Sequence, residues 1–308
     1  MSFAVLFPGQ GSQAVGMGGD LFKDPRLGAT ADEVLGWSLR AACLEGPEDR
    51  LTRTEVAQPA LFAVSFVLWE RLRDLIPTAP AAGAGHSLGE YTALAAAGVV
   101  SFETGLRLVA ARGRAMAAAA DRDPSGMAAL IGADREEAEA VAEARRSDGG
   151  RLWVANVNAP GQVVVAGGRD DIDWVVEHAR EHGIRRAIPL KVAGAFHSPY
   201  MAPAAAQLRQ AIASADFGNA AFPVWANTTA KPHDENVGPA LLEQLTATVR
   251  FADSLVSMAT AGVTDFVHIG PGDVTAGLAK RSIENSVVHV VSGLDDLEPV
   301  SAALAASV

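Results

Sequence analysis

Short apolar runs alternate with longer amphipathic segments along the chain, which predicts strands and helices in turn. Residues 3–7 and 266–269 are continuous apolar runs that predict buried strands. Residues 58–76 predict a long amphipathic helix, with Pro59 in its first turn. Further predicted elements are a helix over 101–120, a strand end at 224–227, a helix over 241–262, and a helix and strand within 274–291. Such alternation is typical of a mostly parallel α/β sheet.

The middle of the chain has a different pattern, which begins after the turn-rich residues 121–125. Its predicted elements are a strand at 126–132, a helix at 134–147, strands at 152–157 and 162–166, a helix at 170–182 and a strand at 184–192. This order is that of the ferredoxin-like split unit. We therefore predict a small ferredoxin-like subdomain at 123–192, inserted into a large hydrolase-like α/β domain made of residues 1–122 and 193–308.

Composition restricts the class of protein. The chain has 308 residues, 49% of them hydrophobic, which suffices for a large domain carrying a smaller one. A net charge of −11 argues against nucleic-acid partners and against a basic membrane-binding face. Cys43 is the single cysteine, so no internal disulfide forms, and no segment approaches the roughly 20 apolar residues of a membrane span. We expect a cytoplasmic protein that is not anchored to a membrane.

Gly85-His86-Ser87-Leu88-Gly89 has the Gly-x-Ser-x-Gly pattern of a nucleophile elbow. Small residues at 81–84 precede it, and a helical run over 88–97 follows it and stops at Gly98. In such an elbow the glycines avoid collisions with neighbouring backbone, and the helix N-terminus supplies N–H groups where an oxyanion would form. The five residues alone also fit a glycine-rich turn that happens to hold a serine, but the strand before and the helix after favour the elbow.

Two further places could contribute to a site. His197 opens the return to the large domain, on a loop between a strand and a helix, although a lone histidine is more often structural. The helix over 101–120 carries three arginines, any of which could either lie on a solvated face or point inward to a substrate anion. They are Arg107, Arg112 and Arg114.

Motifs for metals and cofactors are incomplete. His178-Ala179-Arg180-Glu181-His182 matches the His-x-x-Glu-His pattern of some zinc peptidases, but its helix resembles a charged surface helix and no third ligand motif follows. Residues 16–19 lack the setting of a dinucleotide fingerprint, and residues 270–272 lack the lysine of a phosphate-binding loop. We expect neither a metal nor a cofactor.

Six motifs occur together and in order over nearly the whole length. They are Phe7–Gln13, Gly85–Glu90, Arg112-Gly113, Asn158–Gln162, Gly194–Ser198 and Gly270–Gly272. With them the chain closely resembles the malonyl-CoA:acyl-carrier-protein transacylases of fatty acid synthesis and the related acyltransferase domains of polyketide synthases. The resemblance implies transfer of a malonyl group from malonyl-CoA to the phosphopantetheine thiol of an acyl carrier protein, by a ping-pong route through a malonyl-serine.

The resemblance also implies roles for individual residues. Ser87 is the implied nucleophile, and His197 is the implied general base and later the acid. The family orients this histidine through a backbone carbonyl near the position of Gln244, which implies a dyad without a carboxylate. The backbone N–H groups of Gln10 and Leu88 are the implied oxyanion hole.

Substrate recognition follows from the same resemblance. Arg112 is expected to bind the malonyl carboxylate through its two-pronged guanidinium. His86, Phe196 and Gln244 are the other expected substrate-binding residues. The Gly-Ala-Phe-His form of the histidine motif is similar to that of members that prefer malonyl over branched methylmalonyl units.

The expected partner is an acidic carrier protein, and this chain is acidic too, so docking needs local basic residues. The candidates are Arg185, Arg186, Lys191, Lys280 and Arg281. Because monomers are common in the family, we expect a monomer. The alternatives are a stand-alone acyltransferase that serves a polyketide synthase, a serine thioesterase or other hydrolase that uses water as acceptor, a metal peptidase built on His178 and His182, and a non-catalytic carrier-protein scaffold.

Overall fold

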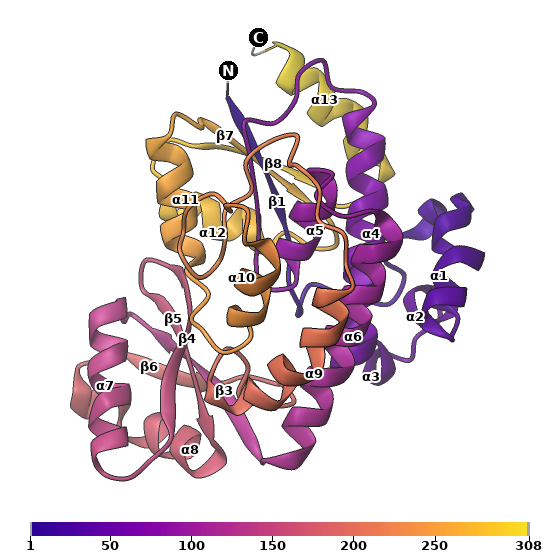
Figure 1. Ribbon diagram of the computed structural model, residues 1–308. Helices are drawn as coiled ribbons and strands as arrows, with labels where there is room; N and C mark the ends of the chain where they lie inside the picture. Colours follow the sequence, from indigo (N-terminus) through magenta and orange to yellow (C-terminus); the bar gives the residue numbers. More distant parts are fainter. Residues whose placement is uncertain (1, 307–308) are drawn as a thin grey trace.

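Two separate four-stranded sheets organise the molecule (Figure 1). The computed structural model describes residues 2–306. The larger sheet has the order β2-β1-β7-β8, and every neighbouring pair in it is parallel. Its strands are β1 (Phe3–Phe7), β2 (Ala82–Gly85), β7 (Asp265–Ile269) and β8 (Val287–Val291). The predicted α/β class with a mostly parallel sheet is confirmed.

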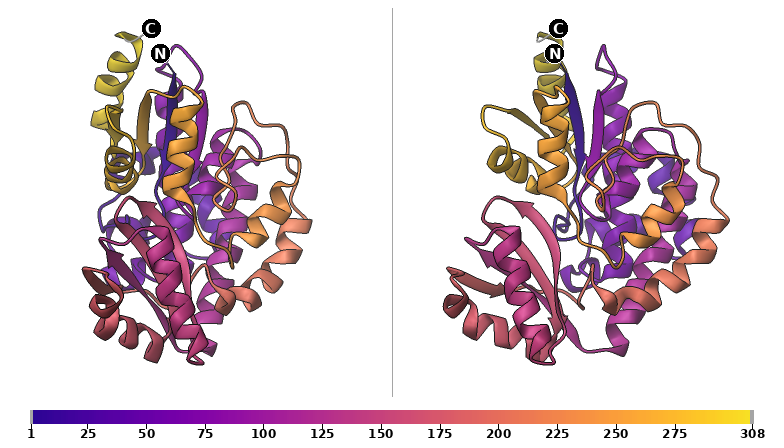
Figure 2. Two further views of the ribbon diagram at one scale, coloured as in Figure 1. Left: turned by 90° about the vertical axis from the view of Figure 1, so that its left-hand side faces the viewer. Right: turned by 60° about the vertical axis from the view of Figure 1, so that its left-hand side comes forward.

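Helices cover both faces of the larger sheet, as the views in Figure 2 show. Along β1, Val5 and Phe7 pack into an apolar cluster with α4, whereas Ala4 and Leu6 pack into a second cluster with α11 and α12. A strand buried on both faces reads as a continuous apolar run, which is why residues 3–7 were recognisable. The helices of this domain are α1 (Ala29–Leu35), α2 (Leu39–Leu44), α3 (Glu48–Leu51), α4 (Thr54–Arg73), α5 (Gly89–Ala96), α6 (Phe102–Arg122), α9 (Ala202–Ala213), α10 (Val237–Glu243), α11 (Phe251–Thr260), α12 (Val274–Ser282) and α13 (Leu297–Ala306).

The smaller sheet is antiparallel, has the order β4-β5-β3-β6, and lies at the lower left of Figure 1. Its elements are β3 (Ser125–Ile131), α7 (Arg135–Ser147), β4 (Leu152–Ala159), β5 (Gln162–Gly168), α8 (Arg169–His178) and β6 (Arg186–Pro189). One face packs on α7 and α8, and the other contributes Met127, Val164 and Ala166 to the core of the larger domain. This arrangement is ferredoxin-like, as predicted. The sheet lies within 123–192, while the domain boundaries themselves stay a prediction.

Two elements differ from expectation in their extent. Helix α4 begins at Thr54, four residues before the predicted start, so Pro59 lies in its second turn and not in its first. The missing N–H of this proline leaves the carbonyl of Glu55 without its helical partner. The last strand of the insert, predicted over 184–192, is limited to the four residues of β6.

The segment between α9 and α11 is less regular than predicted. The range 241–262 is not one helix, because residues 244–250 separate α10 from α11. This connection runs beside β4, where Val249 forms an isolated bridge with Asn156. Residues 224–227 likewise form only isolated bridges, so no strand ends there. The irregular backbone becomes important below because it leaves carbonyl and amide groups free to point inward.

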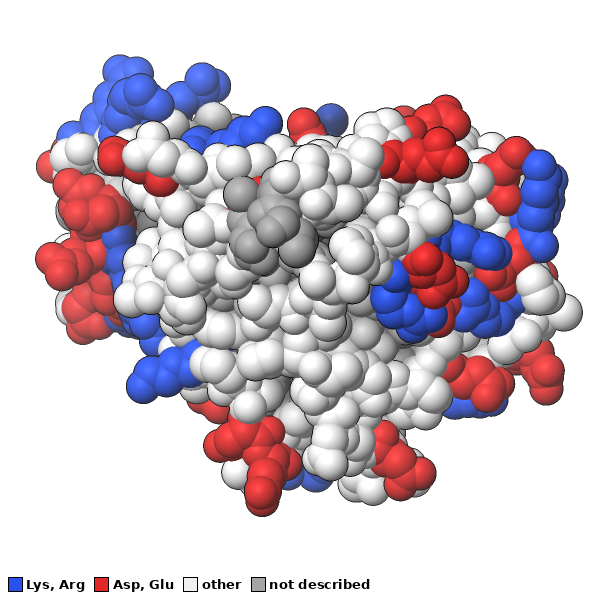
Figure 3. All heavy atoms as spheres, turned by 90° about the horizontal axis from the view of Figure 1, so that it is seen from above, with Lys and Arg blue, Asp and Glu red and all other residues white. Residues whose placement is uncertain are grey.

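The face beside α13 carries few charges in its middle. Seen from above in Figure 3, the described residues there are mostly other than lysine, arginine, aspartate and glutamate, and charged side chains of both signs lie around the rim. Within residues 2–306 no helix has both the length and the apolar character needed to cross a membrane.

Candidate active site

Ser87 lies at the turn between β2 and α5, with a left-handed backbone φ of 52°. A Cβ on Gly85 would lie 1.8 Å from the carbonyl carbon of Gly89, and a Cβ on Gly89 would lie 2.2 Å from the carbonyl oxygen of Phe7. No non-hydrogen atom can replace the hydrogen at either glycine without moving the backbone. The strand-turn-helix arrangement and the steric reason for both glycines are therefore as predicted.

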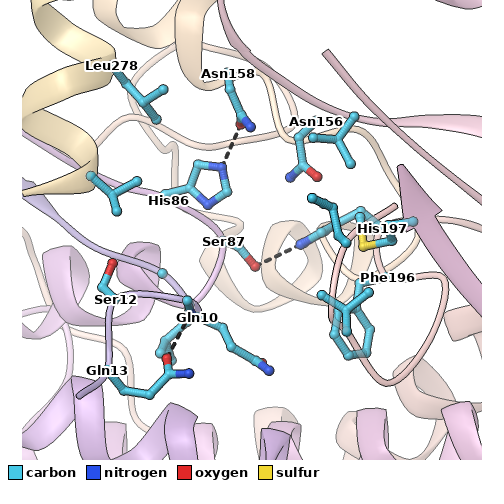
Figure 4. A pocket seen from close by; sticks show the side chains of 18 of the residues that line it. Gln10, Ser12, Gln13, His86, Ser87, Asn156, Asn158, Phe196, His197 and Leu278 are labelled. Atoms are coloured by element: carbon cyan, nitrogen blue, oxygen red, sulfur yellow. Dashed lines mark hydrogen bonds between the residues drawn. The ribbon is translucent and has the colours of Figure 1, made fainter. Parts of the chain in front are cut away.

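Ser87 and His197 point toward each other in the lining of one cavity (Figure 4). The Ser87 hydroxyl is 2.7 Å from His197 Nε2, and His197 Nδ1 donates to the backbone carbonyl of Gln244 over 2.8 Å. A donor at Nδ1 makes Nε2 the acceptor for the serine proton. Burial lowers the pKa of His197 to about 3, and the nearby positive charge of Arg112 acts in the same direction. The imidazole is therefore neutral, and no carboxylate within residues 2–306 contacts it.

Arg112 points into the protein, whereas Arg107 and Arg114 on the same helix are exposed. Its guanidinium donates to three neutral oxygens: Gln58 Oε1 at 2.8 Å, Gln244 Oε1 at 2.9 Å and the Ser87 hydroxyl at 3.0 Å. Its Nε has no hydrogen-bond partner within residues 2–306. Burial lowers the pKa of Arg112, yet a guanidinium stays protonated in proteins. The site thus contains a fully buried cation with no carboxylate in contact.

The cavity, of about 470 Å³, lies between the two sheets. The larger domain contributes Gln10, His86, Leu88 and Arg112 to its wall, and the insert contributes residues of β3, β4 and β5. His86 Nε2 and Asn158 Oδ1, 2.7 Å apart, join the two parts. Most of the predicted site residues line this cavity: Gln10, His86, Ser87, Leu88, Arg112, Lys191, Phe196, His197 and Arg281. Gln244 does not line it but is hydrogen-bonded to Arg112, which does. The remaining predicted residues, Arg185, Arg186 and Lys280, do not line it.

The loop that holds Gln10 lies against the elbow that holds Leu88. A Cβ on Gly9 would lie 2.5 Å from the carbonyl oxygen of His86, so the loop after β1 packs directly against the elbow. Within residues 2–306 the N–H groups of Gln10 and Leu88 donate to no other residue. Two unpaired donors beside a hydroxyl can bind an oxygen that becomes negative during a reaction.

Two residues of the site have no assignment from the sequence alone. Asn227 is fully buried; its Oδ1 accepts from the Ser87 backbone N–H and its Nδ2 donates to the Gly85 carbonyl, both over 2.8 Å. Gln58 supplies one of the three acceptors of Arg112. Gln58 sits in an amphipathic helix and Asn227 in a segment that resembles a strand end, so no local signal distinguishes either one.

The two histidines of the zinc-peptidase pattern, His178 and His182, both pack against the ring of Trp174. His178 Nδ1 lies 2.9 Å from the backbone carbonyl of Trp174, and its ring stacks on the Trp174 indole. Across residues 2–306, no group of three or more histidine, cysteine, aspartate or glutamate side chains is placed to hold a metal ion.

Comparisons with known proteins find relatives along nearly the whole chain. Residues 4–296 match the family model described as "Acyl transferase domain". A malonyl CoA-acyl carrier protein transacylase of Bacillus subtilis is 41% identical, over 96% of this chain and 95% of that protein. A polyketide biosynthesis malonyl CoA-acyl carrier protein transacylase of the same organism is 39% identical, over 90% of this chain and 95% of that protein.

Solved structures show the same fold. A malonyl-transacylase determined in complex with its type II polyketide acyl-carrier protein superposes with a TM-score of 0.93 at 35% identity, and the match covers 98% of this chain and 100% of that one. The fold is therefore shared with proteins of this kind.

The depressed pKa of His197 predicts a pH dependence of stability. Between the ordinary pKa of 6.5 and about 3, the unfolded chain binds a proton at this residue that the folded chain does not bind. The free energy of unfolding must therefore fall as the pH is lowered through this window. His197 has a left-handed φ of 57°, which asparagine tolerates, and an asparagine side chain binds no proton in this pH range. Between pH 7 and pH 5 the free energy of unfolding of His197→Asn should therefore fall by about 2 kcal/mol less than that of the wild type. Urea unfolding measures this, and equal losses in the two proteins would contradict the assignment.

Proposed function

Because the chain belongs to the acyl transferase family, we propose that it moves a malonyl group from malonyl-CoA to the phosphopantetheine thiol of an acyl carrier protein. The observation that supports this choice of acyl group is the buried Arg112, which has no carboxylate partner and lies 3.0 Å from the Ser87 hydroxyl. A malonyl unit carries a carboxylate at the end opposite its thioester, so one bound unit can place its thioester at Ser87 and its carboxylate at Arg112.

In the first half-reaction the Ser87 oxygen attacks the thioester carbonyl while its proton passes to His197 Nε2. The Gln244 carbonyl, which accepts from Nδ1, stabilises the resulting imidazolium. The N–H groups of Gln10 and Leu88 hold the oxyanion. The C–S bond then breaks, His197 returns the proton to the coenzyme A thiolate, and malonyl-Ser87 remains.

The second half-reaction reverses these steps with a different thiol. His197 takes the proton of the phosphopantetheine thiol, the thiolate attacks the malonyl ester, and Ser87 leaves with the proton. The neutral form of His197 is needed at the start of each half-reaction, and its low pKa keeps that form populated. Because the ester would also react with water, transfer requires that water be kept away from it until the second thiol arrives.

Selectivity follows from the burial of Arg112. A malonyl carboxylate supplies the missing anion, whereas an acetyl group leaves the cation without a charged partner. We expect this difference to be on the order of 2–5 kcal/mol, or roughly 30-fold to several thousand-fold in rate. Phe196 belongs to the wall beside the acyl group, so a branched methylmalonyl unit should fit less well.

Of the two relatives named above, one is named for polyketide biosynthesis and the other is not, and the proposed chemistry at Ser87 is the same for either kind of carrier protein. We assign the protein to fatty acid synthesis, with a stand-alone polyketide acyltransferase as the alternative. A hydrolase is less well supported, because the usual serine hydrolase has an acid beside its histidine and this site has a backbone carbonyl there. We further propose a cytoplasmic monomer that works without membrane or nucleic-acid partners.

The carrier protein is proposed to dock on the basic residues near the cavity mouth. Lys191 and Arg281 are exposed and line the cavity from opposite parts of the molecule, the insert side and α12. Arg185, Arg186 and Lys280 are also exposed and complete the predicted set. An acidic carrier would meet these charges in spite of the net charge of −11.

Acylation of Ser87 tests the proposed function directly. After brief exposure to malonyl-CoA, intact-mass spectrometry should show the wild type heavier by one malonyl group and Ser87→Ala unchanged, because the variant has no hydroxyl to acylate. Ser301→Ala, which removes a hydroxyl on α13 far from the cavity, is the matched control and should be acylated. Equal labelling of Ser87→Ala would exclude this serine as the nucleophile.

Charge reversal tests the docking residues. In Lys191→Glu/Arg281→Glu, preloaded malonyl-enzyme should transfer to the carrier protein with a KM raised several-fold, while transfer to a small thiol stays unchanged. The exposed Lys231 does not line the cavity, so Lys231→Glu is the control and should behave as wild type. An unchanged KM in the double variant would remove these two residues from the docking surface.

A further inference from the structure

Glu90 is a buried carboxylate, 1% exposed, in the first turn of α5, three residues after Ser87. Its Oε2 accepts from the Asn227 backbone N–H over 3.0 Å and from Gln244 Nε2 over 2.7 Å. Its Oε1 lies 2.7 Å from His233 Nε2. All three partners come from the irregular segment between α9 and α11, which is thereby fixed to the helix that follows the nucleophile.

Two of these partners, Asn227 and Gln244, are themselves hydrogen-bonded to the elbow or to the catalytic groups. Asn227 holds the elbow through the Ser87 N–H and the Gly85 carbonyl. Gln244 donates to the Ser87 carbonyl over 2.9 Å, accepts from Arg112 through its side-chain oxygen and accepts from His197 through its backbone oxygen. A single residue, Gln244, therefore connects Glu90 by hydrogen bonds to Ser87, His197 and Arg112.

Glu90 and the Ser87 carbonyl together set the orientation of the Gln244 amide. An amide side chain has an oxygen and an NH2 group of similar shape, and a flip would present NH2 to the guanidinium of Arg112, where two donors would face each other. The carboxylate of Glu90 and the backbone carbonyl of Ser87 both accept from the NH2 group, and the Glu90 contact is the one made to a carboxylate. Together they fix the NH2 group on their side and leave the amide oxygen for Arg112.

The third partner, His233, is a largely buried residue that does not line the cavity of Ser87. Its side chain is 6% exposed, and it lines two other pockets that share no residue with the cavity of Ser87. It is the only basic side chain within residues 2–306 that contacts Glu90. Without it, Glu90 Oε1 would be a buried charged oxygen with no partner, and the carboxylate would have to turn toward other donors.

We propose that the Glu90–His233 pair is a positioning device for malonyl recognition: His233 fixes the Glu90 carboxylate, Glu90 fixes the Gln244 amide, and Gln244 holds Arg112 in place for the substrate carboxylate. This inference rests on the proposed malonyl transfer. Neither residue lines the cavity of Ser87, so both are positioning residues. Their effect must be larger for a substrate that uses Arg112 than for one that does not.

The experiment compares two replacements of His233. His233→Phe keeps a ring of similar size but removes the N–H donor, and His233→Gln places an amide N–H near the position of Nε2. Rates of Ser87 acylation are measured with malonyl-CoA and with acetyl-CoA, and kcat/KM is compared between the two. If His233→Phe does not fold, His233→Asn replaces it, because the shorter amide cannot reach Glu90.

In His233→Phe we expect the malonyl-to-acetyl ratio of kcat/KM to fall about tenfold, the effect of losing one hydrogen bond to a charged group, and in His233→Gln to return toward the wild-type ratio. His289→Phe is the control. His289 lies on β8, 3.5 Å from Asp265 on β7, and does not line the cavity, so its replacement should leave the ratio unchanged.

An unchanged ratio in His233→Phe, an equal loss with both substrates, or an equal shift in His289→Phe would overturn the inference, since each would indicate a purely structural role. A wild-type protein that takes no malonyl group from malonyl-CoA would instead contradict the proposed function. The two failures are thus distinguishable.

Discussion

The site depends on one buried cation whose charge is balanced by no adjacent carboxylate. Arg112 donates to two amide oxygens and a hydroxyl, all of them neutral. A fully buried charge of this kind costs free energy unless hydrogen bonds surround it, and Gln58 and Gln244 supply them. A carboxylate in permanent contact would stabilise the protein further but would also occupy the place of an acidic substrate. The nearest negative charge, Glu90, lies one amide away and leaves the guanidinium available.

The fold brings this cation to the nucleophile from distant parts of the chain. The elbow places Ser87 at the end of β2, α6 contributes Arg112 and the loop before α9 contributes His197. The ferredoxin-like insert completes the cavity with residues of β3, β4 and β5. Steric demands at Gly85 and Gly89 fix the turn so tightly that the hydroxyl position follows from the backbone.

Much of this arrangement was predictable because short sequence patterns carry it. The elbow could be predicted because its glycines follow a local steric rule, and the insert could be predicted because its helices and strands alternate in a known order. The inward direction of Arg112 was not: helical periodicity alone left Arg107, Arg112 and Arg114 equivalent, and only the resemblance to a family singled one out. Asn227 and His233 were missed because their contacts join positions 140 and 143 residues apart along the chain. The break between α10 and α11 was also missed, and it is this break that presents the Gln244 carbonyl to His197.

The central claim is that the unpaired guanidinium of Arg112 selects an acyl group with its own carboxylate. The most direct test is the ratio of kcat/KM for malonyl-CoA and acetyl-CoA in the wild type and in Arg112→Met, which keeps a long side chain but removes the charge. The account predicts a wild-type preference for malonyl of at least roughly 30-fold that collapses in the variant, mainly through loss of malonyl transfer. A variant that still prefers malonyl to the same degree would contradict it.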